Sequence, residues 1–124
     1  MIREISIPVT TTGTDGNAVG NATSDTEING FLVDVYLDYA GTAPATTDVT
    51  ITHESPSRGN LLVVTDNATD GLYHPRAKLV DNANAAITNS HDHFALNGSI
   101  KVAVAGCNAL APAVTAWIRY EDNE

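Results

Sequence analysis

The segment "FLVDVYLDY", residues 31–39, constrains the fold most strongly, because its residue types alternate with a period of two. The odd-numbered positions share one face of an extended chain and are all apolar or aromatic: Phe31, Val33, Val35, Leu37 and Tyr39. The even-numbered positions face the other way and include two carboxylates: Leu32, Asp34, Tyr36 and Asp38. This pattern predicts a β-strand with one face on a core and the other toward water or a partner.

The same alternation recurs along the chain, whereas helical spacing is almost absent. Strand-like runs lie at residues 4–9, 47–53, 61–65, 99–106 and 113–121. Gly, Asn, Asp, Ser and Pro residues that favour turns separate these runs. We therefore predict an all-β protein, a single antiparallel β-sandwich or jelly roll of about eight strands, with one domain over residues 1–124.

Three runs carry more specific predictions. Pro8 cannot donate a ladder hydrogen bond, so the first strand should lie at a sheet edge. Residues 61–65 are apolar on both faces, which predicts a strand covered on both sides. Residues 10–26 are rich in Gly, Asn, Asp and Thr and predict one long loop or arm, which is either mobile or makes a contact in an assembly.

The charge balance limits the range of partners. The chain has 15 acidic and 6 basic residues, a net charge of −9, and its basic residues are scattered. Nucleic acids and anionic membranes both require clustered basic residues, so neither is an expected partner. The first residues lack the apolar segment of a signal peptide, and no stretch has the roughly 20 apolar residues of a membrane helix. We expect a soluble protein made in the cytoplasm.

The strongest candidate for a metal site is the pair His91 and His93, which flank Asp92. In an extended segment these two imidazoles share a face and could both reach one zinc ion. A catalytic zinc needs a third protein ligand, which would have to be His53 or His74. The alternative, which we favour, is a polar turn before the strand that follows, with no metal and no other cofactor.

Catalytic constellations are not evident in the sequence. Cys107 is the single cysteine and has no neighbouring base, and no Gly-x-Ser-x-Gly motif is present. Asp34 and Asp38 share one face of a strand, but four residues of strand rise separate them by about 13 Å, too far to flank a glycosidic bond. We expect both to lie on a solvated face, and we expect no enzymatic activity.

Several large side chains fall on faces opposite the predicted core. Trp117 points outward with Thr115 and Arg119, and Tyr36 lies between the two aspartates. Trp, Tyr and Arg are the usual anchors of subunit interfaces. The predicted interface residues are Trp117, Tyr36, Arg119, Asp34 and Asp38.

The C-terminal half resembles small structural proteins of tailed bacteriophages, of the head decoration or cement type. The resemblance covers about residues 60–121 and rests on an aromatic-x-Pro-Arg strand, an Asp-x-x-Asn-Ala-Ala-Ile-Thr turn and a Gly-x-Ile-Lys-Val strand. The residues that carry it are Tyr73, Pro75, Arg76, Ala85, Ala86, Ile87, Thr88, Gly98, Ile100, Lys101 and Val102. His91 to His93 fall in the family's variable loop.

The resemblance implies a non-enzymatic virion protein that binds the outer surface of the capsid and stabilises the head. Its expected partners are the major capsid protein and other copies of itself, as a homotrimer, and its expected location is the capsid surface. A carbohydrate- or receptor-binding β-sandwich of a phage tail tip or head fibre is the alternative, since exposed aromatics stack on sugars and acidic, Asn-rich loops can hold calcium.

Overall fold

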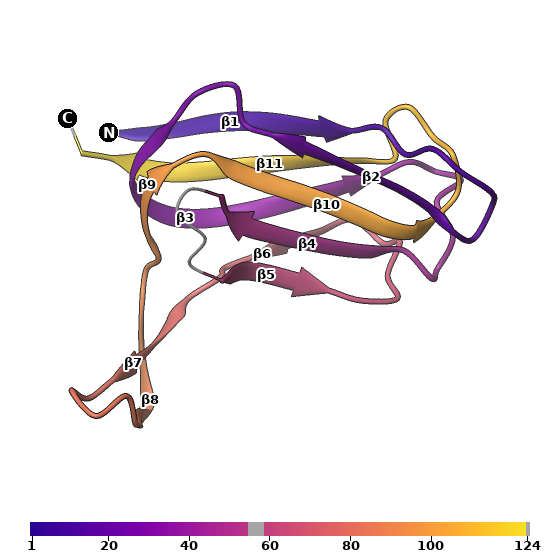
Figure 1. The fold of residues 1–124 in the computed structure, drawn as a ribbon. Coiled ribbons are helices and arrows are strands. Elements are labelled where there is room, and N and C mark those ends of the chain that lie inside the picture. Colours follow the sequence, from indigo (N-terminus) through magenta and orange to yellow (C-terminus); the bar gives the residue numbers. More distant parts are fainter. Residues whose placement is uncertain (55–58, 124) are drawn as a thin grey trace.

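A computed structural model of the chain describes residues 1–54 and 59–123 and is all-β, which confirms the predicted fold class (Figure 1). No helix that could cross a membrane occurs among these residues. The strands are β1 Ile2–Val9, β2 Ala18–Thr23, β3 Ile28–Tyr39, β4 Asp48–His53, β5 Asn60–Val64, β6 Gly71–Tyr73, β7 Ala77–Val80, β8 Ala86–Asp92, β9 Ala95–Gly98, β10 Ile100–Cys107 and β11 Val114–Asp122.

Two antiparallel sheets form the sandwich. The five-stranded sheet has the order β1-β11-β3-β6, and β9 also pairs with β3; the four-stranded sheet has the order β2-β10-β4-β5. Side chains of alternate residues fill the space between them, including Ile118 and Leu37 from one sheet and Ile51 and Val102 from the other. The strand β1 lies at a sheet edge, as Pro8 predicts.

A β-bulge in β3 changes which residues face the core. Arg119 of β11 pairs with Asp34, but the next residue, Tyr120, pairs with Leu32, so Val33 is an extra residue in β3. Beyond the bulge the alternation is out of phase with the predicted one. Leu32 is fully buried, and Phe31, which the sequence places on the core face, is 45% exposed.

Three further predictions are wrong in detail. The residues that the structure describes form eleven strands where about eight are predicted, and residues 10–26 are not one loop because they contain β2. The inward side chains of β2 are Ala18 and Ala22, which are too small to give a strong hydrophobic period. In β5, Leu61 is buried but Val63 is exposed, so this strand is not covered on both sides.

A two-stranded hairpin, β7 and β8, projects away from the sandwich (Figure 1). We call it, with its connecting residues, the arm, residues 74–93. The arm leaves the sandwich after β6 and returns at β9, and both of these strands pair with β3. Its strands pair with each other and with no other strand among the described residues.

Candidate interface: the outer face of the five-stranded sheet and the arm

Four side chains form a row across the outer face of the five-stranded sheet. In the strand register, Trp117 lies opposite Ser6 on one side and Tyr36 on the other, and Tyr36 lies opposite Leu72. Trp117 and Tyr36 are each 39% exposed, and Leu72 is 52% exposed. The prediction that Trp117 and Tyr36 point away from the core is therefore confirmed, and Leu72 extends the row by one strand.

A groove of about 320 Å³ lies on the same side of the sheet, nearer the base of the arm, and Arg119 lies between the groove and the row. It is lined by Ile2, Phe31, Val33, His93 and Glu121. Phe31 reaches the groove because the bulge places it on the outer side of β3. We call the row and the groove together the outer apolar face; its apolar members are Ile2, Phe31, Val33, Tyr36, Leu72 and Trp117.

The opposite side of the sandwich has a different character. The outward residues of its central pairs are small or polar, such as Thr50 opposite Ala103 and Thr52 opposite Lys101. Val19 and Val63 are exposed on the two edge strands of that sheet, β2 and β5. Exposed aromatic side chains thus gather on one side of the sandwich, which is the pattern of a specific contact surface.

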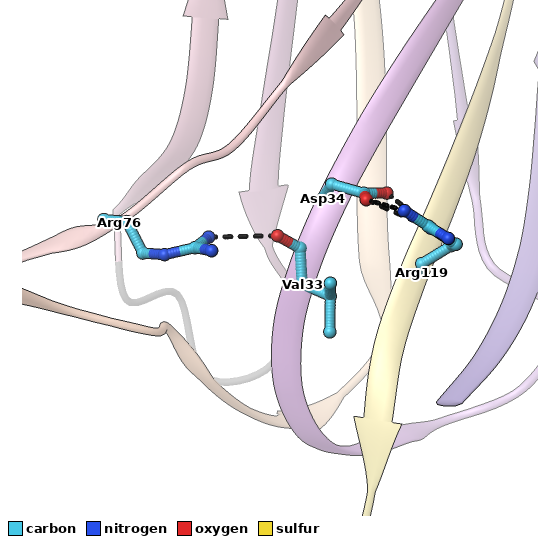
Figure 2. Close-up of polar contacts among 4 residues, drawn as sticks. All are labelled: Val33, Asp34, Arg76 and Arg119. Carbon is cyan, nitrogen blue, oxygen red and sulfur yellow. Dashed lines mark hydrogen bonds and ion pairs between the residues drawn. The ribbon is translucent and has the colours of Figure 1, made fainter. Parts of the chain in front are cut away.

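Asp34 and Arg119 form an ion pair at the bulge (Figure 2). The Nε of Arg119 lies 3.0 Å from each oxygen of the Asp34 carboxylate, and Nη2 donates to Oδ2 as well. These hydrogen bonds raise the pKa of Arg119, and the negative charge of Asp34 raises it further by a smaller amount. Asp34 is buried, so the prediction that it lies on a solvated face is wrong, whereas Asp38 is exposed as predicted.

The base of the arm is fixed to β3 on both sides of the bulge. The strand β9 pairs with residues 28–31 of β3, and β6 pairs with residues 35–37. Between these two pairings, Nη1 of Arg76 donates a hydrogen bond to the carbonyl oxygen of Val33 at 3.0 Å (Figure 2). The amide of Leu32 donates a second hydrogen bond, to the carbonyl oxygen of Phe94. Pro75 is buried beside Arg76, so the Pro-Arg pair attaches the arm to the sandwich.

The tip of the arm is a turn held by one aspartate. The Asp81 carboxylate accepts hydrogen bonds from the amides of Ala83 and Ala85, both at 2.9 Å. Asn84 adopts a left-handed φ of 64°, a conformation that Asn and Gly tolerate best. The Asp-x-x-Asn part of the sequence motif is therefore explained by the geometry of this turn.

Apolar side chains are exposed on both faces of the arm. Val80 pairs with Ala86, and the ladder shifts register between Val80 and Lys78. Neighbouring residues of a strand point to opposite faces, so Leu79 and Ile87 point away from the face of Val80 and Ala86. Leu79, Val80 and Ile87 are all large and exposed. They were not among the predicted interface residues, because "AKLV" and "AAIT" are too short to give a clear period.

The histidines of the predicted metal site lie in different segments, and His74 lies between β6 and β7. His91 lies in β8 opposite Lys78, His93 lies beyond the end of β8, and His53 is buried, where its Nε2 accepts a hydrogen bond from the amide of Asn97. His91 is therefore not in the polar turn that the sequence predicts, whereas His93 does lie in the short connection before β9. Among residues 1–54 and 59–123, no three His, Cys, Asp or Glu side chains are grouped so that they could hold a metal ion.

Comparisons with known proteins concern the fold. No protein-family model and no curated protein sequence matches the chain. The structure is similar to the Aeromonas sobria serine protease in its complex with the chaperone ORF2, with a TM-score of 0.50 and 10% identity over 98% of this chain. This chain covers 27% of the protease chain. At this identity, the likeness shows a shared β-sandwich fold alone.

Weaker likenesses extend to viral proteins. A structure of infectious bursal disease virus, Gt strain, has a TM-score of 0.36 and 10% identity over 96% of this chain and 30% of that chain. The enzymatically active domain of tailspike protein 4 of bacteriophage CBA120 has a TM-score of 0.35 and 12% identity over 97% of this chain and 19% of that chain.

Proposed function

We propose that this chain is a non-enzymatic structural protein of a phage virion, a decoration or cement protein that binds the outer surface of the capsid. The observation that carries the proposal is the outer apolar face. Its aromatic side chains, Trp117, Tyr36 and Phe31, are exposed on one side of a sandwich whose core is already complete without them. Large exposed aromatics with an adjacent arginine, Arg119, are typical anchors of protein interfaces.

The resemblance of residues 60–121 to decoration proteins supports the same proposal. Its motif residues have structural roles at the arm: Arg76 attaches the arm to β3, and Ala85 and Ala86 follow Asn84 in the turn at its tip. The proposed partner is the major capsid protein, bound through the outer apolar face. The proposed mechanism is burial of apolar surface that bridges neighbouring capsid subunits at many equivalent positions.

The test is binding of the purified protein to capsids that lack it. Replacement of Trp117 by Ala removes the largest exposed side chain of the face and should weaken capsid binding at least about tenfold, as for an interface hot spot. The matched control is Val63→Ala, because Val63 is exposed on the other sheet. Co-sedimentation with capsids measures binding, and thermal unfolding measures stability.

The expected result is a large loss of binding for Trp117→Ala with a small loss of stability, and no change for Val63→Ala. Equal binding by all three proteins would contradict the proposal. So would a variant at Trp117 whose only defect is in folding.

A second candidate function rests on two of the aromatic side chains of the outer apolar face. Trp117 and Tyr36 are exposed on an open sheet face, where a sugar ring can stack. A carbohydrate- or receptor-binding module of a phage tail tip or head fibre would bind glycans there. A glycan array probed with and without a chelator distinguishes the two functions, since a decoration protein should give no specific glycan signal.

A further inference from the structure

We infer that the arms of neighbouring copies pack against each other and join this protein into a closed ring of copies. The inference extends the proposed function by naming the surface for self-association, and it assigns the outer apolar face to the capsid alone. It is testable on the purified chain, so its failure is distinguishable from a failure of capsid binding.

The first argument is the exposure of the arm. Leu79, Val80 and Ile87 are 41%, 48% and 47% exposed in the single chain. An isolated two-stranded hairpin is at best marginally stable in water, because it has no core on which to bury its apolar side chains. A hairpin with apolar residues on both faces therefore requires cover from another molecule.

The second argument is the fixed base of the arm. Where the chain enters the arm, Arg76 donates a hydrogen bond to the carbonyl oxygen of Val33. Where the chain leaves the arm, the carbonyl oxygen of Phe94 accepts one from the amide of Leu32. The turn at the tip is closed by Asp81. Binding through a preorganised element costs less conformational entropy than binding through a flexible one.

The third argument identifies the occupant by charge. The whole chain has a net charge of −9, but residues 74–93 contain two acidic residues, Asp81 and Asp92, and two basic ones, Arg76 and Lys78. The arm is thus formally neutral, and the net negative charge belongs to the rest of the chain. Two copies of this acidic protein can approach arm to arm with the least like-charge repulsion. The partner best suited to the arm is therefore another arm.

The two apolar faces of the arm also indicate the symmetry of the assembly. One face carries Val80 and Ala86, and the other carries Leu79 and Ile87. If one face of each arm contacts the opposite face of the next, the contact is heterologous. Such a contact gives a ring where the rotation between copies closes and an open filament where it does not, and the finite homotrimer of the proposed function requires the ring. A ring of three arms is the smallest such closure and agrees with the expected homotrimer.

The experiment is sedimentation equilibrium of the purified full chain over a range of concentrations. The mass of the wild type should be that of three or more chains of 13.0 kDa each. The variant Val80→Asp places a charge on one face of the arm, and Ile87→Asp places one on the other. Each variant should raise the dissociation constant of the oligomer roughly tenfold or more. The matched control Val63→Asp changes a valine of similar exposure, 51%, on the sandwich and should leave the mass unchanged.

Two further variants and readouts keep the outcomes distinct. Thermal unfolding of each variant reports whether the sandwich remains folded, and Trp117→Ala, which should lose capsid binding, should keep the oligomer. A wild type that stays at 13.0 kDa at every concentration would overturn the inference. The inference would also be overturned if neither arm variant weakened the oligomer, or if only one of the two did, because the ring requires both faces of the arm.

Discussion

At the residue scale, the bulge in β3 determines the roles of several side chains. The extra residue, Val33, moves Leu32 into the core and Phe31 to the outer face. Two arginines then hold the bulge from opposite sides: Arg119 binds the buried Asp34 carboxylate, and Arg76 binds the Val33 carbonyl oxygen. Because Asp34 is satisfied within the chain, Arg119 is the member of this pair that remains available for contact with a partner.

Tyr39, at the end of β3, leads to a prediction about alkaline pH. Burial raises the pKa of its hydroxyl above 10.0, and the hydrogen bond from Asn67 Nδ2 at 3.3 Å opposes this effect only in part. A raised pKa in the folded state means that Tyr39 contributes stability below about pH 10, which is lost as pH rises through its folded value. The free energy of unfolding should therefore fall above about pH 10.

Denaturant unfolding at pH 8 and at several values above pH 10 measures this effect. The variant Tyr39→Phe should show a weaker decline with pH than the wild type, since it has no hydroxyl to ionise. Tyr36→Phe is the matched control, because Tyr36 is exposed, and it should follow the wild-type curve. Identical pH dependence in all three proteins would contradict the role assigned to Tyr39.

At the scale of the element, the arm depends on a small number of contacts at its base. The variant Arg76→Ala removes the hydrogen bond to Val33 at the point where the arm leaves the sandwich. Amide protons of residues 77–92 should exchange a few-fold to about tenfold faster, as expected for one lost hydrogen bond. Amides of β10 and β11 should keep their protection.

Hydrogen exchange followed by mass spectrometry measures this change, and Lys101→Ala on the four-stranded sheet is the control. Uniform acceleration across the whole chain would mean that Arg76 stabilises the fold in general. Unchanged exchange in the arm would mean that Arg76 does not position it.

Most of the long strands could be predicted from the sequence, because their inward residues are large and alternate regularly. The segments around Ile51, Val102 and Ile118 are examples. The strand β2 could not be predicted, since alanine and glycine on its inward face give almost no hydrophobic period. The arm was not predicted either, because it is exposed on both faces and burial imposes no pattern on its sequence.

The candidate site was predictable only in part for a similar reason. Trp117 and Tyr36 follow from the alternation of β11 and β3, which holds on that side of the bulge. Phe31 and Asp34 do not follow, because the bulge depends on the pairing of two strands far apart in sequence. A turn motif at Asp81 between two short apolar runs was the one signal in the sequence for the hairpin.

At the scale of the whole molecule, the chain separates two surfaces. The outer apolar face belongs to the sandwich, and the arm extends away from the sandwich (Figure 1). A protein that binds a capsid and also binds its own copies requires two such surfaces. Copies joined by their arms would present several outer apolar faces at once, which raises their overall affinity for a repeating surface.

The most direct test of this account is an electron-microscopy map of the virion at a resolution that shows side chains. The account predicts this chain on the outside of the capsid, with Trp117 and Phe31 against the major capsid protein and with the arms of neighbouring copies in contact. A map that places the chain elsewhere in the particle, or that shows the Trp117 side facing solvent, would contradict it.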